Sequence, residues 1–214
     1  MFSSARKPTQ SNTPAALRPL SGSYPPCVGQ ITLFAPDTEI FAQGDRAGSL
    51  YRVEFGAVRV YRLHADGRRQ IVAFHLAGET FGLEAGGTHR FFAETTVHAG
   101  LSKVSLVAGE MVSQDLMALA LGSMLDAREH LLVVGRQSAL ERLGAFLVDL
   151  AERLGDVDTI DLQMTRVDIG DYLGMTIETV SRGFSKLRDE GILKFHGVKT
   201  IEIVQPERLA LLCG

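Results

Sequence analysis

Three polar side chains share one face of a helical pattern near the end of the chain. In residues 174–193, "GMTIETVSRGFSKLRDEGIL", Ser181 and Arg182 follow Glu178 by three and four residues. A guanidinium can donate two hydrogen bonds to O6 and N7 of guanine. A carboxylate can accept from the exocyclic amine of cytosine or adenine, and a hydroxyl can adapt to a neighbouring base. This combination therefore predicts the reading of base edges in a DNA groove.

The flanking residues predict how this face is positioned. Residues 166–174, "RVDIGDYLG", form a short helical pattern after Thr165, Gly174 supplies a turn, and Thr176 is a good N-cap for the next helix. The apolar residues of both helices recur at helical spacing and should face inward: Ile169, Tyr172, Leu173, Ile177, Val180, Phe184 and Leu187. Two short helices joined by a glycine turn, followed by short strands in residues 191–204, indicate a helix-turn-helix.

Polar and basic residues around this motif are candidates for contacts to the DNA backbone. We predict this role for Arg166, Thr176, Thr179, Ser185, Lys186 and Lys199, with Arg188, Lys194 and His196 as further cations. The same segment carries four acids, Asp168, Asp171, Asp189 and Glu190. The alternative is therefore a solvated helical hairpin in which Glu178 and Arg182 form an ordinary ion pair four residues apart.

The composition limits the other possibilities. The 214 residues carry a net charge of −3, so any nucleic-acid binding needs a local basic surface. The two cysteines, Cys27 and Cys213, form no C-x-x-C pair, which argues against a disulfide framework or a thiolate metal site. No signal peptide or apolar stretch long enough to span a membrane occurs, so we expect a cytoplasmic protein without membrane contact.

The rest of the chain divides into three parts by pattern. Residues 1–28 are rich in Ser, Pro and Thr and are expected to form a flexible tail. Residues 29–109 contain short alternating runs broken by turns at Gly56 and at Asp66-Gly67, which predict a small antiparallel barrel or jelly roll. Residues 139–214 contain a further helix, which the sequence predicts to end at Gly155, and then the DNA-binding motif.

Residues 110–138 form one long helical pattern with a wide apolar stripe. The stripe consists of Met117, Leu121, Met124, Leu125, Leu131 and Leu132, with Arg128 interrupting it. Its width favours packing against a second copy of the helix in a homodimer. The alternative is burial against the chain's own β domain.

Several motifs together resemble the CRP/FNR superfamily of bacterial transcription regulators, and within it the FNR/FixK-type branch. "ETVSR" at 178–182 matches the FNR-type Glu-x-x-Ser-Arg signature, and "VGRQSALERLGAFL" and "FGLEAGGTHRFFAE" resemble family segments in the family's order. The resemblance covers about residues 30–205. It implies an α+β chain with an N-terminal cyclic-nucleotide-binding-like β roll, a long dimerisation helix and a C-terminal winged helix-turn-helix. It also implies Glu178, Ser181 and Arg182 as base-reading residues, a homodimer on an inverted repeat of TTGAT-like half-sites, and RNA polymerase as partner.

Two departures from the family concern the signal. The iron–sulfur members hold their cluster with an N-terminal cysteine group, whereas only Cys27 lies in that region here. The cyclic-AMP members bind the phosphate with an Arg-Ser pair, where this chain has Phe92 and Ala93, with Arg90 nearby. We therefore expect no cofactor, in keeping with FixK-type regulators, which are commonly controlled through their own synthesis, and activation in oxygen- or nitrogen-related gene control.

Other functions remain open from sequence. A regulator of the same family could bind haem or another small effector in its β roll, and a thiol could have a redox role. A metal held by His75, His89 and His98 is conceivable, but the six histidines are scattered and no catalytic motif is recognisable, so an enzyme is not expected.

Overall fold

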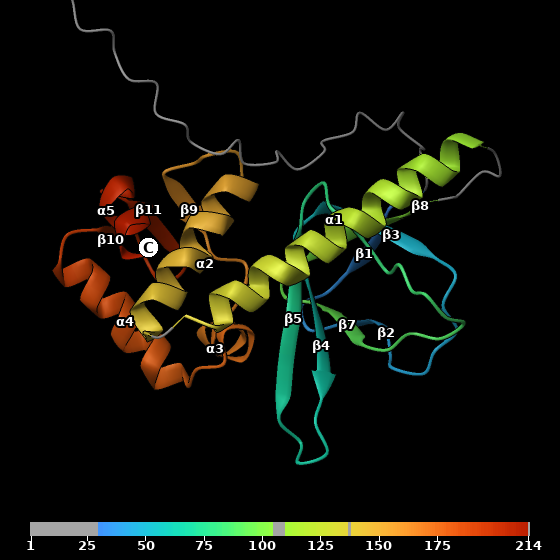
Figure 1. The fold of residues 1–214 in the computed structure, drawn as a ribbon, viewed down its shortest axis with the longest axis horizontal. Coiled ribbons are helices and arrows are strands. Elements are labelled where there is room, and N and C mark those ends of the chain that lie inside the picture. Colours follow the sequence, from blue (N-terminus) through green and yellow to red (C-terminus); the bar gives the residue numbers. More distant parts are fainter. Residues whose placement is uncertain (1–29, 105–109, 137, 214) are drawn as a thin grey trace, which may run out of the picture.

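The computed structural model describes residues 30–104, 110–136 and 138–213, without the side chains of 110–113 and 115. The predicted flexible tail, Cys27 among it, lies outside these residues. Figure 1 shows a β-rich part crossed by a long helix, α1, which leads into a smaller and mainly helical part. The two parts meet where the strands β4 and β5 approach the helix α3.

The β-rich part is a roll of two antiparallel sheets. Its strands are β1 (Thr32–Phe34), β2 (Glu39–Phe41), β3 (Leu50–Phe55), β4 (Ala57–Leu63), β5 (Arg69–Leu76), β6 (Thr80–Phe81), β7 (Phe92–Thr95) and β8 (Ala99–Val104). They pair in the orders β1-β8-β3-β6 and β2-β7-β4-β5. Alternate residues such as Val53, Val58 and Leu101 point into a shared core, because successive side chains of a strand face opposite sides. The predicted β roll is confirmed.

The helical part contains the predicted winged helix-turn-helix. After α1 (Glu110–Val134) come α2 (Ala139–Arg153), β9 (Thr159–Asp161), α3 (Arg166–Leu173), α4 (Ile177–Asp189), β10 (Leu193–Phe195), β11 (Thr200–Ile203) and α5 (Pro206–Leu212). The strands form a sheet in the order β10-β11-β9, and the turn between β10 and β11 is the wing. Strand β9 and helix α5 were not predicted, because each has too few residues to show a clear period.

A continuous core joins α2 to α3 and α4. Val180, Phe184 and Leu187 are fully buried, as predicted, whereas Ile177 is 43% exposed, so its predicted burial is wrong. Ile177 is the first residue of α4, and the buried stripe begins one turn later, at Val180. The structure also shows what Gly183 lies against: a Cβ atom there would lie 2.8 Å from Cδ2 of buried Leu143, so a side chain at this position would require the Leu143 side chain to shift.

Candidate DNA-binding surface

A threonine side chain caps the N-terminus of each of the helices α3 and α4. The Thr165 hydroxyl accepts a hydrogen bond from the Asp168 amide, and the Asp168 carboxylate accepts one from the Thr165 amide, which makes a capping box. Gly174 ends α3 with φ of +64°, in the left-handed region that favours glycine. Thr176 then caps α4 by accepting from the Thr179 amide at 3.3 Å. The caps and the turn set the angle between the two helices.

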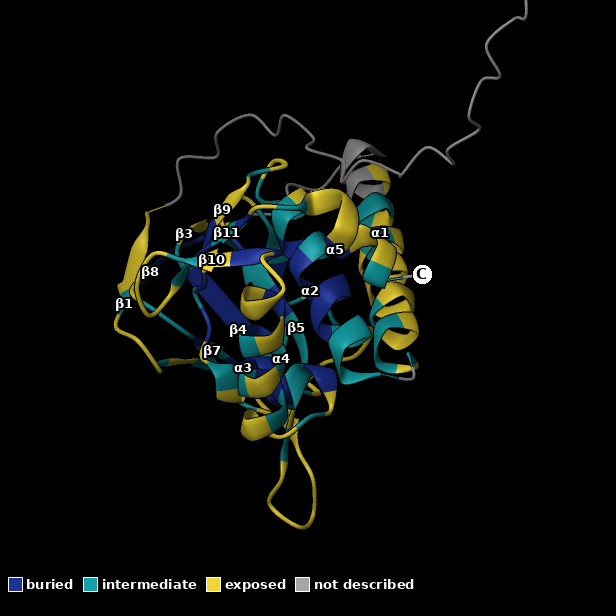
Figure 2. Cartoon of the chain, turned by 90° about the vertical axis from the view of Figure 1, so that its left-hand side faces the viewer, coloured by how far each residue is buried: buried dark blue, intermediate teal, exposed yellow. Residues whose placement is uncertain are grey.

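The three predicted base-reading residues lie together on the outer face of α4. Glu178 and Arg182 are exposed and Ser181 is half-buried, and Figure 2 shows α4 with an exposed outer face among the residues described. Ser181 and Arg182 line an open surface depression together with Ser185 and Lys186. The pKa of Glu178 is lowered because its carboxylate accepts hydrogen bonds from its own amide and from Thr176, and because Arg182 is close. The face thus presents one carboxylate, one hydroxyl and one guanidinium to solvent.

The predicted backbone-contacting residues surround this face, with one exception. Thr176 and Thr179 are at the N-terminus of α4, where free amide groups favour anions, and their hydroxyl oxygens are 3.1 Å apart. Lys199 is exposed in the wing. Arg166 is half-buried instead, with its guanidinium 5.2 Å from the centre of the Phe184 ring and 6.0 Å from that of Phe195. This stacking holds Arg166 against the core of the winged helix.

The remaining predicted cations are partly neutralised by acids of the chain. Lys186 lies 3.9 Å from Glu190, and Arg188 lies 2.9 Å from Asp189. In the wing, Glu202 accepts from His196 at 2.5 Å and lies 3.8 Å from Lys194. Val198, at the tip of the wing, is 88% exposed. The sequence did not indicate the exposed position of Val198, because a single valine forms no pattern that would place it at the tip of a hairpin.

The acids that counted against DNA binding separate into two groups in the structure. Asp168 and Asp171 lie on α3 and face the β roll, where Arg69 contacts both at 2.6 and 2.8 Å. They are therefore turned away from the base-reading face. Asp189 and Glu190 are at the end of α4, where they pair with its basic residues. Asp168 and Asp171 thus pair with the roll, whereas Asp189 and Glu190 line the same surface depression as Arg182.

The described residues leave the predicted apolar stripe of helix α1 exposed. The exposed fractions are 60% for Met117, 48% for Leu121, 42% for Met124, 39% for Leu125, 70% for Leu131 and 72% for Leu132. Figure 2 shows α1 as exposed or half-buried along the residues described. The alternative of burial against the chain's own β roll does not hold for these six side chains. These exposed apolar side chains, interrupted by Arg128, lie along one helix and are of the kind that partners cover.

An ion pair between Arg153 of α2 and Glu79 joins α2 to the β roll, in addition to the contacts that Arg69 makes with α3. Arg153 donates to Glu79 at 2.8 and 3.0 Å and to the carbonyl oxygen of Phe74 at 2.6 Å. Burial acts to raise the pKa of Glu79, but the nearby His75 and the hydrogen-bonded Arg153 outweigh it and lower the pKa to about 2. Glu79 is therefore ionised at neutral pH and holds Arg153 against the roll.

Phe92 and Ala93 stand in this chain where the cyclic-AMP members have their phosphate-binding Arg-Ser pair. The Phe92 ring stacks on Tyr61 at 5.2 Å, and Ala93 is fully buried. Glu84 accepts a hydrogen bond from the Arg90 amide, and the Arg90 side chain is exposed to solvent. Neither Phe92 nor Ala93 can supply the cation and hydroxyl with which the Arg-Ser pair of the cyclic-AMP members binds the phosphate.

The histidines of the roll have separate environments. His89 is buried and stacks on Phe41 with the ring centres 3.6 Å apart, His75 lies 3.7 Å from Glu79, and His98 is exposed. Within the described ranges, no three metal-ligating side chains come together. Nor does any helix there have both the length and the apolar character that a membrane span requires. Cys213 is the C-cap residue of α5. It is half-buried, and burial raises the pKa of its thiol.

Comparison with known proteins agrees with this architecture. Residues 31–111 match the family description "Cyclic nucleotide-binding domain", and residues 141–212 match "Crp-like helix-turn-helix domain". The nitrogen fixation regulation protein FixK of Rhizobium meliloti is 47% identical over all 214 residues, which is the full length of both chains. This chain belongs to the FixK-type branch of the CRP/FNR family.

Other members support the same assignment. FixK of Azorhizobium caulinodans is 42% identical over 178 residues, covering 78% of this chain and 72% of that one. The structure of FixK2 from Bradyrhizobium japonicum superimposes with a TM-score of 0.82 at 39% identity, over 87% of this chain and 98% of the other. The protein is thus a DNA-binding transcription regulator of the FixK type, and its relatives are regulators and not enzymes.

Proposed function

We propose that the protein is a homodimeric transcription regulator that binds an inverted repeat of TTGAT-like half-sites and activates transcription through RNA polymerase. The observation that supports this proposal is the outward presentation of Glu178, Ser181 and Arg182 on a capped helix, on a face that the described residues leave open to solvent. Arg182 pairs with guanine, Glu178 with an exocyclic amine and Ser181 with an adjacent base. A cytoplasmic location follows from this role.

The uncovered stripe of α1 supports the dimer. A two-fold axis along α1 would bring Met117, Leu121 and Met124 against the same residues of a second copy and remove them from water. It would also place two recognition helices on one side of the dimer. An inverted repeat with half-sites one helical turn apart, about 34 Å, is the DNA target that matches such a pair.

Binding without an effector is the second part of the proposal. The Phe92 and Ala93 contacts leave no cation for a cyclic phosphate, and the two cysteines are too few for an iron–sulfur cluster. We therefore expect the purified protein to bind DNA under air without an added ligand. Binding of haem or another small effector in the roll is the competing possibility, and an absorbance spectrum of the purified protein distinguishes haem from no haem.

The test compares a TTGAT palindrome with a scrambled duplex of equal length, using protein purified under air without effector. We expect the palindrome to bind at least about 10³-fold more tightly. Arg182→Ala should remove this preference, because a base contact is lost. Lys199→Ala should weaken both duplexes to the same degree and lower the salt dependence by about one counterion for each protomer, or about two for the dimer. Equal binding of wild-type protein to both duplexes would refute the proposed function.

A further inference from the structure

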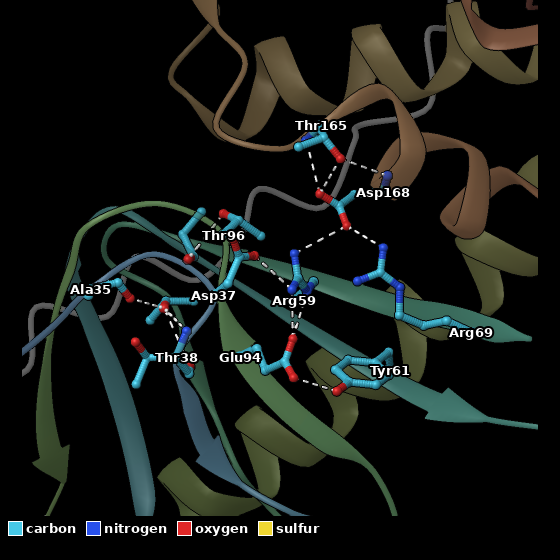
Figure 3. Close-up of polar contacts among 12 residues, drawn as sticks. Ala35, Asp37, Thr38, Arg59, Tyr61, Arg69, Glu94, Thr96, Thr165 and Asp168 are labelled. Atoms are coloured by element: carbon cyan, nitrogen blue, oxygen red, sulfur yellow. Dashed lines mark hydrogen bonds and ion pairs between the residues drawn. The ribbon is translucent and has the colours of Figure 1, made fainter. Parts of the chain in front are cut away.

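A buried carboxylate connects the DNA-binding part to the β roll. Asp168, in the first turn of α3, is only 1% exposed. Its Oδ2 accepts from the amide and hydroxyl of Thr165 at 3.0 and 2.7 Å, within its own helix cap. Its Oδ1 accepts from Arg59 of β4 at 3.3 Å and from Arg69 of β5 at 2.6 Å. Figure 3 shows the two guanidinium groups reaching this one oxygen from the roll.

Arg59 is held in place by the roll itself. It is 7% exposed, and it donates to Glu94 at 2.6 and 3.1 Å and to Asp37 at 2.9 Å. Tyr61 donates to the other oxygen of Glu94 at 2.5 Å. These contacts fix the guanidinium independently of the DNA-binding part, as Figure 3 shows. The roll therefore offers Asp168 a donor whose direction is already set.

Arg69 makes the contact specific to the orientation of α3. Its Nη2 donates to Asp168 and its Nε to Asp171, at 2.6 and 2.8 Å. These two acids are three residues apart, so they lie on the same face of α3. A rotation of α3 about its axis would break one or both bonds. Two parallel hydrogen bonds from one planar guanidinium thus define the rotation of the helix as well as its position.

The contact contributes more to geometry than to net stability. Removing several charges from water is costly, and an apolar contact of similar size often stabilises a fold as much or more. Apolar side chains already meet at this junction, where the Phe74 ring lies 5.2 Å from that of Tyr172. Such apolar contacts persist when α3 shifts slightly along the roll, whereas the hydrogen bonds to Asp168 form in only one relative position of α3 and the roll. The network is therefore suited to select one orientation of α3 against the roll.

From these contacts we infer that Asp168, held by Arg59 and Arg69, is a positioning residue that sets which half-site spacing the dimer accepts. The inference rests on the proposed function, in which α1 joins the two rolls. Because α3 and α4 are fixed to each other by the Gly174 turn, the orientation of α3 on the roll also orients α4. In a dimer, this orientation determines how far apart the two sets of base-reading residues lie.

The test uses a set of duplexes in which two half-sites are separated by the preferred number of base pairs, or by one or two more or fewer, together with a duplex that has a single half-site. The variant is Arg69→Gln, which removes the bonds to Asp168 and Asp171 from a residue whose side chain is 23% exposed. The matched control is Arg68→Gln, which removes the same charge from the same hairpin, where exposed Arg68 pairs with Asp66 of the same turn.

We expect Arg69→Gln to lose about tenfold in affinity at the preferred spacing and less at the others, so that the spacing preference flattens. Binding to the single half-site should not change. Arg69→Lys, which keeps the charge and a donor, should recover part of the preference, and Arg68→Gln should match the wild type. Circular dichroism and thermal unfolding confirm that each variant is folded, and Asp171→Asn, which removes only the second bond, provides an independent variant.

An unchanged spacing profile in folded Arg69→Gln and Asp171→Asn would overturn the inference. So would an equal loss on every duplex, the single half-site included, because that result indicates a general structural defect. Failure of the proposed function gives a different result, since wild-type protein would then show no preference for any of the spacings over scrambled DNA.

Discussion

Leu121→Glu on α1 tests the dimer interface most sharply. Burial of a whole leucine side chain contributes about 1.5–3 kcal/mol. Leu121 keeps 48% of its surface exposed in the single chain. Covering this surface should therefore contribute about 0.7–1.4 kcal/mol for each copy. A two-fold interface contains the residue twice, so the variant should lose about 1.5–3 kcal/mol, and a buried carboxylate adds to the loss.

This loss corresponds to a dimer dissociation constant at least about 10-fold higher, and up to about 100-fold. Sedimentation equilibrium over a range of protein concentrations measures the change. The control is Leu63→Glu at the end of β4, where the same side chain is 46% exposed and lies away from α1. An unchanged dissociation constant in Leu121→Glu, or an equal rise in Leu63→Glu, would show that the dimer forms through another surface.

Three further predictions concern stability and reactivity. Because the pKa of Glu79 is lowered to about 2, its contribution to folding is complete above the unfolded value of 4.5 and is lost as the pH falls from 4.5 towards 2. Urea unfolding at several pH values should show this decrease, and Glu79→Gln should make it smaller; an equal slope in the variant would contradict the assignment. Gly183→Leu should lower the free energy of unfolding by about 1–3 kcal/mol, since the new side chain overlaps with Leu143, whereas an increase would mean that helix propensity outweighs packing. Cys213 should react slowly with iodoacetamide at pH 8 until the protein unfolds, because burial raises its pKa; reaction as fast as that of a free thiol would contradict its position.

The local elements of this fold could be read from the sequence because each carries its own period or turn. The alternating strands around Gly56, the glycine turn at Gly174 and the N-cap at Thr176 all form where their residues indicate. Ile177 shows the limit of this reasoning. Its spacing fits the buried stripe of α4, but it is the first residue of the helix and remains 43% exposed.

Contacts between distant residues could not be read in this way. Asp168 and Arg69 are 99 residues apart in the chain, and no local pattern indicates that they meet. In the sequence, Asp168 and Asp171 only reduce the positive charge of a DNA-binding motif. In the structure they face the roll, because α3 packs on β5 with that side. Gly183 likewise has a reason only once Leu143 of α2 is known to lie against it.

The central claim is that Arg182 reads a guanine in each half-site, and one binding experiment addresses it directly. Wild-type protein and Arg182→Ala are each titrated with the TTGAT palindrome and with a palindrome in which the G·C pair of both half-sites is replaced by A·T. Each lost pairing costs about 1–3 kcal/mol, so the wild type should bind the altered duplex at least about 30-fold more weakly. Arg182→Ala should bind the two duplexes within about threefold of each other. If the variant distinguishes them as strongly as the wild type does, Arg182 does not read the guanine and the assignment of the base-reading face is wrong.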